Sequence, residues 1–169
     1  MGGTKAAFEN ARPVLHSVAD RVFYVGKRAG SAQMMHQING SLASILYAIS
    51  CEAFVAGAKA GLSPEMMSKV MSIDTGRNAA SARIILEQVA TRRFEHGKAI
   101  ADSCRELTLM TDEARRRGVT MWVSDKTRQL YALAAQLGKP QEDMTRLIVH
   151  YEKWANVEVR AAGMPRLPA

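Results

Sequence analysis

The chain lacks the sequence patterns by which proteins most often bind nucleotide phosphates or metal ions. Its 169 residues contain neither G-x-G-x-x-G nor G-x-x-x-x-G-K-[ST], the two glycine-rich patterns that cradle phosphates. The four histidines and two cysteines show no metal-ligand spacing, so we expect no metal site. No serine, threonine or cysteine has an obvious base nearby in sequence, so no covalent nucleophile is predicted.

Few features of the sequence indicate that the protein binds nucleic acid or crosses a membrane. The net charge is +7, but the basic residues are scattered, apart from Arg92-Arg93 and a triplet at 115–117, and no basic stripe with aromatics appears. The triplet precedes Gly118, where cations favour a helix C-terminus. The longest apolar run, 41–51, is too short to cross a bilayer, and no secretory leader is evident. We therefore expect a cytoplasmic protein, with Cys51 and Cys104 as free thiols.

The longest stretch in which nothing interrupts a helix covers residues 31–61. It contains no proline, and its only interior glycines are Gly40 and Gly57. A helix of this length extends about 45 Å at roughly 1.5 Å per residue, which is more than the width of a small domain. The stretch therefore predicts a central helix on which other helices pack. Small residues at four-residue steps, such as Ala53, Gly57 and Gly61, favour close helix packing there.

Most of the remaining chain also has helical spacing. Gly61 and Ser63-Pro64-Glu65 are strong stop and start signals. We expect helices at 5–19, 64–73, 79–91, 98–117, from a cap at Ser124 or Asp125 to 137, and at 141–162. The fold class is therefore mostly α, with six to seven helices around one long central helix.

Residues 1–30 differ from this pattern. The helix at 5–19 is followed by Arg21-Val22-Phe23-Tyr24-Val25, a β-branched and aromatic run that predicts a short strand. Helix followed by strand is a piece of an α/β unit, yet no partner strands are predicted. Such a strand either belongs to a larger protein or pairs irregularly.

Several stretches, taken in order and spacing, resemble the C-terminal half of the β-hydroxyacid dehydrogenases. This family includes 3-hydroxyisobutyrate dehydrogenase, tartronate semialdehyde reductase and 6-phosphogluconate dehydrogenase. The resemblance covers almost the whole chain. The matching stretches are Gly2-Gly3 with the run at 21–25 and Gly26; Gly30-Ser31-Ala32-Gln33; Glu52-Ala53 and 58–65; Thr75-Gly76-Arg77-Asn78; Arg105-Glu106-Leu107; and Glu142-Asp143-Met144-Thr145.

The resemblance implies three parts. Residues 1–30 correspond to the last helix-strand unit of a truncated dinucleotide-binding Rossmann domain. Residues 31–163 correspond to an all-helical domain that binds substrate and forms dimers, like the C-terminal domain of 6-phosphogluconate dehydrogenase. Residues 164–169 form a tail. An intact member transfers hydride between NAD or NADP and a small hydroxy acid, and we expect the isolated chain to be inactive and to bind no cofactor.

The resemblance also implies a catalytic lysine early in the long helix and a substrate-binding asparagine one turn later. Aligned without a gap from Gly30, these positions hold His36 and Gly40, with Asn39 beside the second. Alternatively, residues 34–37 match the I-I-H-Q of threonate-dehydrogenase-like members, with the lysine deleted. Either alignment lacks the lysine. His36 is then either its replacement as proton donor or an ordinary helix histidine bound to a carbonyl or water.

Further candidate site residues follow from the same resemblance. Gln37, Asn39 and Gly40 are candidates for substrate binding, as are Thr75 and Arg77, although each also has an ordinary structural explanation. Val149 takes the place of a second lysine that lies near the cofactor in the family, and His150 is adjacent.

Two functions remain open on the sequence. The first is the substrate-binding and dimerisation domain of an NAD(P)-dependent β-hydroxyacid dehydrogenase-like oxidoreductase. The alternative is a non-catalytic helical module derived from that family, which keeps its association surface. Both predict a homodimer, because apolar helix faces that lose a neighbouring domain usually find a partner.

Overall fold

A computed structural model describes residues 1–163, so the predicted tail at 164–169 lies outside the described residues. The chain divides into two compact units, Met1–Gly40 and the residues from Ser41 onward. The central helix α2, Ser31–Lys59, contributes its first ten residues to one unit and the rest to the other.

The first unit is built around helix α1, Lys5–Val18, which begins where the Thr4 hydroxyl accepts a hydrogen bond from the Ala7 amide. Phe8 is its buried residue, with its ring 5.3 Å from that of Tyr24. The strand predicted at 21–25 does not form. The segment and Gly26 instead pair irregularly with Met1–Gly3. The Val25 amide donates to the Met1 carbonyl and the Gly3 amide to the Gly26 carbonyl, both at 3.0 Å, and Gly2 and Gly26 form an isolated parallel bridge. The described residues offer no further strand that would extend this pairing into a sheet.

The predicted central helix is confirmed, since α2 runs unbroken over 29 residues. It ends at Lys59. Gly61 follows with a φ of +86°, which permits the Leu62 amide to donate to the Gly57 carbonyl and the Gly61 amide to donate to the Ala58 carbonyl. By length and composition alone α2 could cross a membrane, with a mean hydropathy of 1.5 over its most apolar 18 residues. Half of that window is buried within the protein, as in the core helix of a folded domain.

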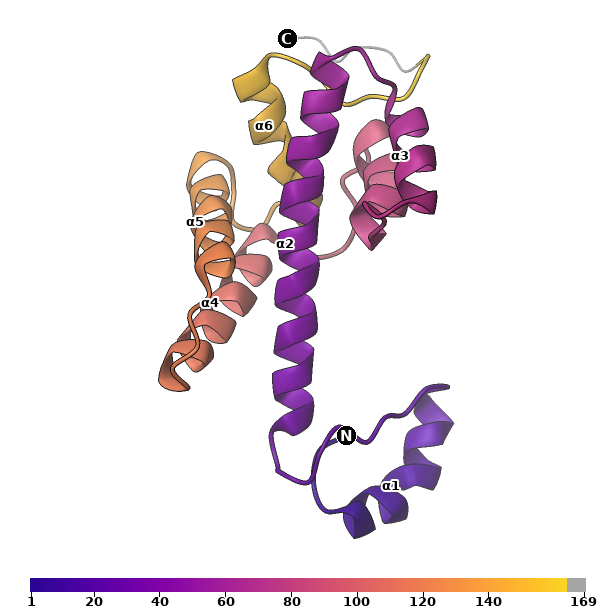
Figure 1. Cartoon of the computed structure of the whole chain (residues 1–169), viewed down its shortest axis with the longest axis vertical. Helices are drawn as coiled ribbons and strands as arrows, with labels where there is room; N and C mark the ends of the chain where they lie inside the picture. The colour runs from indigo at the N-terminus through magenta and orange to yellow at the C-terminus, as the bar shows by residue number, and fades with distance from the viewer. Residues whose placement is uncertain (164–169) are drawn as a thin grey trace. The chain divides into compact units, whose positions relative to one another are not determined.

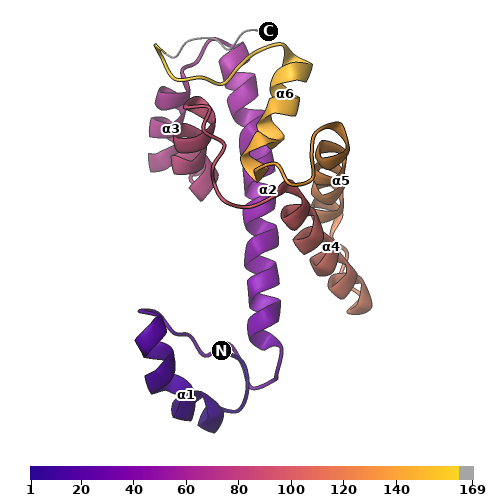
Figure 2. The same cartoon turned by 180° about the vertical axis from the view of Figure 1, so that it is seen from behind.

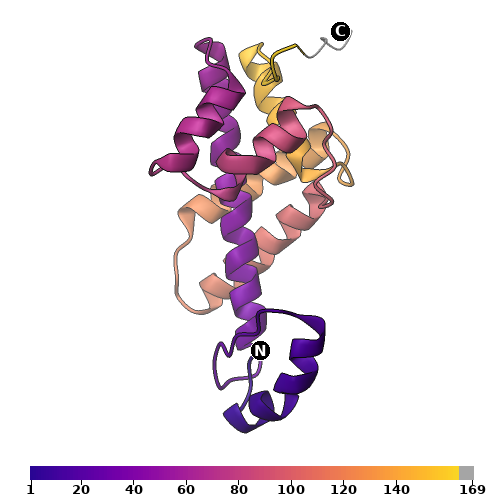
Figure 3. The same cartoon turned by 90° about the vertical axis from the view of Figure 1, so that its right-hand side faces the viewer.

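The second unit packs its helices on opposite sides of α2, as Figures 1 and 2 show. Helices α3 and η1 lie together on one side, and the α4–α5 pair lies on the other. Figure 3 shows the segment 117–121 that joins α4 to α5. The elements after α2 are α3 (Pro64–Ile73), η1 (Ala80–Ala90), α4 (Ile100–Arg116), α5 (Trp122–Leu137), the 3₁₀ turn η2 (Met144–Arg146) and α6 (Leu147–Ala155).

The predicted fold class of six to seven helices around one long helix is therefore confirmed. Helix α3 has the predicted bounds and start. The Ser63 hydroxyl accepts a hydrogen bond from the Met66 amide, and Pro64 occupies the first turn.

The helix predicted at 79–91 is present, but η1 is a π-helix. Its buried residues come in neighbouring pairs, at 80 and 81, 84 and 85, and 89 and 90. These pairs recur every four to five residues, whereas an α-helix buries positions three and four apart. The wider interval fits hydrogen bonds from each residue to the fifth one along the chain.

The predicted cap of α5 is wrong. The helix begins at Trp122, before Ser124 and Asp125, and no side chain caps it. Ser124 is buried inside the first turn, and the Asp125 amide donates to the Met121 carbonyl. Both polar residues therefore lie within the helix, where Asp125 places negative charge near its positive end.

The last helix is shorter than the predicted 141–162. Asp143 caps a 3₁₀ turn, with Oδ1 accepting from the Thr145 amide at 2.9 Å, and α6 then ends at Asn156. Asn156 adopts the left-handed conformation with a φ of +49°, which asparagine tolerates better than most residues. Residues 157–163 are not helical, and they carry Val159 into the core.

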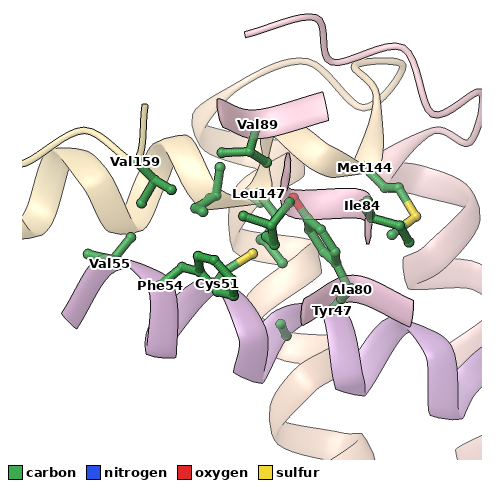
Figure 4. Packing of buried hydrophobic residues seen from close by; sticks show 14 of the residues in the cluster. Tyr47, Cys51, Phe54, Val55, Ala80, Ile84, Val89, Met144, Leu147 and Val159 are labelled. Atoms are coloured by element: carbon green, nitrogen blue, oxygen red, sulfur yellow. The ribbon is translucent and has the colours of Figure 1, made fainter. Parts of the chain in front are cut away.

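The core of the second unit forms where α2 meets η1, η2 and α6 (Figure 4). Tyr47, Cys51 and Phe54 of α2 are fully buried. The Tyr47 hydroxyl donates to the Thr145 carbonyl at 2.7 Å, so this buried polar group is satisfied. Gly57 admits Met67 of α3 so closely that a Cβ at Gly57 would overlap the methionine sulfur, so the predicted close packing is confirmed at this position. Ala53 and Gly61 are exposed, and nothing in the described residues lies within 4 Å of a Cβ built on Gly61, so the prediction is wrong there.

A buried ion pair fastens the end of the described chain to this core. Arg92 Nη1 lies 2.7 Å from Glu152 Oε1, and both side chains are largely buried. The same carboxylate oxygen accepts from the Val159 amide at 2.8 Å. One carboxylate therefore links the end of η1, α6 and the segment after α6.

Candidate functional site

The candidate residues of the first unit lie on the first turns of α2. His36 and Asn39 are exposed, and Gln37 and Gly40 are half-buried. Residues three and four apart share a helix face, so His36 presents its imidazole on the same face as Asn39 and Gly40. Gln37 is one residue further and is turned by about 100° around the helix axis. The helix thus groups a titratable ring, an amide and a position without a side chain.

The turn at 75–78 belongs to the second unit, and Asn78 fixes it. Its Oδ1 accepts from the Ala80 and Ser81 amides at 2.8 and 3.1 Å, which satisfies the start of η1. The Asn78 amide nitrogen lies 3.3 Å from the Ser50 hydroxyl of α2. A side chain that sequence reasoning placed at the edge of the turn therefore ties it to the central helix.

Thr75 and Arg77 project from this turn into solvent. The Thr75 amide donates to Asp74 Oδ1 at 2.6 Å, and the Arg77 amide donates to the Asp74 carbonyl at 3.1 Å. Among residues 1–163 no carboxylate forms an ion pair with the Arg77 guanidinium. This cation is therefore positioned by its backbone and available to an external anion.

Val149 and His150 lie on α6 in the second unit. Val149 is half-buried and packs against the core, whereas His150 is buried. Burial, followed by the charge of Lys153, lowers the pKa of His150, and nearby Glu142 opposes this shift. The imidazole is consequently biased toward its neutral form, and its ring centre lies 6.2 Å from that of Trp154.

The candidate residues do not form one site, because they lie in three separate groups. His36, Gln37, Asn39 and Gly40 share one helix end; Thr75 and Arg77 share one turn; Val149 and His150 are neighbours on α6. The first group belongs to a different compact unit from the other two. Within the described part of the chain, no three His, Cys, Asp or Glu residues gather as metal ligands would.

Sequence reasoning missed a surface of the second unit between α2 and α5. There the Tyr151 hydroxyl donates to Glu52 Oε1 at 3.0 Å, so the hydrogen-bond partner of this carboxylate is a neutral tyrosine. Burial, followed by the Glu52 carboxylate, raises the pKa of Tyr151. A groove of about 560 Å³ opens beside this pair. In the sequence, the only feature that could have indicated this surface is Trp122, a large aromatic residue that does not continue the apolar spacing of the helix that follows it.

The chain is similar to known proteins over most of its length. The family model for NAD-binding of NADP-dependent 3-hydroxyisobutyrate dehydrogenase matches residues 30–151. The 2-(hydroxymethyl)glutarate dehydrogenase of Eubacterium barkeri is 26% identical over 94% of this chain and 52% of its own length. The L-threonate dehydrogenase of Escherichia coli K12 is 25% identical over 86% of this chain and 48% of its own length.

Solved structures show the same helical fold. A 3-hydroxyisobutyrate dehydrogenase from Salmonella typhimurium superposes with a TM-score of 0.79 at 23% identity, covering 88% of this chain and 52% of that one. The Mycobacterium tuberculosis 3-hydroxyisobutyrate dehydrogenase, solved with L-serine, gives 0.79 at 24% identity, covering 89% and 53%. The chain spans about half the length of these relatives. With the family model matched across most of its length, the chain belongs to the 3-hydroxyisobutyrate dehydrogenase family.

Proposed function

We propose that this chain is the helical substrate-binding and dimerisation domain of an NAD(P)-dependent β-hydroxyacid dehydrogenase-like oxidoreductase. The observation that carries the proposal is the family match over residues 30–151, which covers the helical domain from the start of α2 to α6. The substrate class is a small hydroxy acid, since the curated relatives are dehydrogenases of 2-(hydroxymethyl)glutarate, 3-hydroxyisobutyrate and L-threonate.

Two groups of residues have the chemistry for such a substrate. Arg77 offers an exposed guanidinium that can pair with a carboxylate. His36 takes the role of the general acid/base in place of the family's lysine: it accepts the proton of the substrate hydroxyl during oxidation and returns it during reduction. The chain has no lysine between Lys27 and Lys59. Asn39, Gln37 and Thr75 supply polar groups, and Gly40 leaves room beside His36.

The residues described here do not by themselves fit a whole dinucleotide. The chain has no glycine-rich phosphate turn, and Val149 and His150 offer an apolar side chain and a buried imidazole with a lowered pKa. NAD or NADP would accept the hydride from the hydroxy acid when a dinucleotide-binding domain holds it. We therefore expect no saturable NAD(P)H binding to residues 1–169, measured by calorimetry or fluorescence; binding at micromolar concentration would refute this part.

The catalytic part is tested in a protein that contains the dinucleotide-binding half. If the gene encodes a glycine-rich βαβ segment upstream of Met1, the full-length protein should oxidise small β-hydroxy acids with NAD or NADP. His36→Ala should lower kcat by about 10²–10⁴-fold if His36 transfers the proton. His36→Lys, which restores the family's residue, should retain more activity. Unchanged turnover in His36→Ala would remove His36 from the mechanism.

The second candidate is a non-catalytic homodimerisation module derived from the same family. The absence of a lysine from the first turns of α2 favours it. A gene that encodes no glycine-rich βαβ segment upstream would support this module, as would a full-length protein without turnover on any small hydroxy acid. The homodimer is common to both candidates and is tested by light scattering.

A further inference from the structure

The groove between α2 and α5 is an open apolar surface of the second unit. Ile45 and Ile49 of α2 form one wall, and Leu130 of α5 lies on the other. The hollow has a volume of about 560 Å³, which is within the range of sites that hold side chains or small ligands. Ile49 is 53% exposed although it lies in the middle of the central helix. This face of α2 is therefore left without a packing partner in the described chain.

A large exposed side chain, Trp122, is among the residues that line the same groove. Trp122 is 80% exposed, and the neighbouring Val123 is exposed as well. A tryptophan can bury roughly 150–250 Å², and tryptophan is the residue most enriched among the dominant contacts of protein interfaces. One face of the unit thus carries both an apolar projection and an apolar hollow of sufficient size to receive it.

The same face carries one charge of each sign on opposite walls. Glu52 of α2 lines the groove and is bonded to the neutral Tyr151 hydroxyl. Lys126 of α5 lines it too, and its ammonium group lies 3.4 Å from Gln129 Oε1. Within the described residues neither group forms an ion pair. The groove therefore has a carboxylate on its α2 wall and an ammonium group on its α5 wall.

We propose that this face is the docking surface for a second copy of the same chain. In the pair, Trp122 of each copy enters the groove of the other, and Glu52 of each copy faces Lys126 of the other. We choose a second copy as the occupant because Trp122, the groove and both charged groups lie on one face. That face is therefore complementary to itself, as an isologous interface requires. The assignment rests on the homodimer proposed above and identifies which surface forms it.

The first test measures the dimer dissociation constant of the full chain by sedimentation equilibrium. Trp122→Glu should raise that constant by at least about 30-fold, the effect of losing a dominant interface residue. The matched control is Ile73→Glu at the end of α3, an equally exposed apolar residue on the other side of α2 (Figure 1), which should change the constant less than threefold. Far-ultraviolet circular dichroism should show the same helicity in all three proteins.

The second test exchanges the charges and does not depend on removing an aromatic side chain. Glu52→Lys and Lys126→Glu should each weaken the dimer several-fold at low salt, because each places like charges opposite one another. The double variant should restore most of the affinity. Double exchange without recovery would overturn the proposed pairing.

The outcomes separate this assignment from the proposed homodimer. A wild-type monomer at tens of micromolar would overturn both. A stable dimer that Trp122→Glu leaves intact would overturn only the docking surface. A dimer sensitive to Ile73→Glu and insensitive to Trp122→Glu would overturn it as well and would move the interface to α3.

Discussion

The two faces of α2 in the second unit carry similarly apolar residues but differ in what covers them. On one face Tyr47, Cys51 and Phe54 are fully buried, and the tyrosine hydroxyl has a hydrogen-bond partner. On the other, Ile49 is half-exposed and Glu52 borders an open groove. Because hydrophobic stabilisation scales with the area removed from water, the first face stabilises the fold, and the second can stabilise only an assembly. The position of a residue around the α2 axis therefore decides whether its burial stabilises the fold or an assembly.

The largest effect expected from this difference is at Phe54. Phe54→Ala should lower the free energy of unfolding by about 3–5 kcal/mol, because it removes a fully buried ring and leaves a cavity. Ile49→Ala on the open face is the matched control and should cost under about 0.5 kcal/mol in the monomer. Urea denaturation at a concentration below the dimer dissociation constant measures both. Equal losses at the two positions would contradict the assignment of the faces.

A smaller effect is expected at Gly57, where α3 approaches the central helix. Gly57→Ala should destabilise by about 1–3 kcal/mol, although alanine favours a helix, because the added Cβ overlaps Met67. Combining it with Met67→Ala should recover part of the loss. The double-mutant cycle in thermal unfolding gives the coupling, and strict additivity would count against this contact.

Tyr47→Phe tests the polar group of the buried face. The change deletes a buried hydrogen bond and leaves the Thr145 carbonyl without that donor, so a loss of about 1–2 kcal/mol is expected. Tyr24→Phe in the first unit, where the hydroxyl bonds the Gly3 carbonyl in a solvent-exposed setting, should cost less. If both changes cost the same, burial does not strengthen the bond.

The smallest expected effect is a pH dependence from His150. Its pKa in the folded protein lies below the ordinary value of 6.5 because of burial, so the unfolded chain binds a proton more readily. Its contribution to stability is therefore complete above about pH 6.5 and is lost as the pH falls toward the lower folded-state pKa. His150→Gln should flatten the stability profile between pH 7.5 and 5.5. An unchanged profile would assign that dependence to other groups.

The parts of the fold that were predictable depend on local chemistry. Ser63 and Pro64 start α3 where expected, because a capping hydroxyl and a proline act within one turn. Helix α5 begins at Trp122 without a capping side chain, so the prediction that Ser124 or Asp125 caps it placed the start of the helix too late. The π-helical winding of η1 is not predictable in the same way, because its apolar spacing also fits an α-helix, and only burial in the folded unit shows the pairs at 80–81, 84–85 and 89–90 that fit the wider turn.

The candidate site is less predictable, because it depends on contacts between distant segments. The resemblance selected His36, Arg77 and His150 by their positions in a motif, and their roles remain predictions. The bond between Glu52 and Tyr151 joins residues 99 positions apart, and no spacing rule connects them. The groove beside them is likewise a product of tertiary packing.

The ion pair of Arg92 with Glu152 and the burial of Val159 also bear on how the chain folds during synthesis. Val159 packs in the same core cluster as Phe54, although about 100 residues separate them. At roughly 5–20 residues per second, a ribosome needs about 5–20 s to make that interval. Throughout it, the buried face of α2 has been made but its last covering residue has not. The most apolar helix of the described residues must therefore remain soluble, or be shielded by a chaperone, until Val159 has been made.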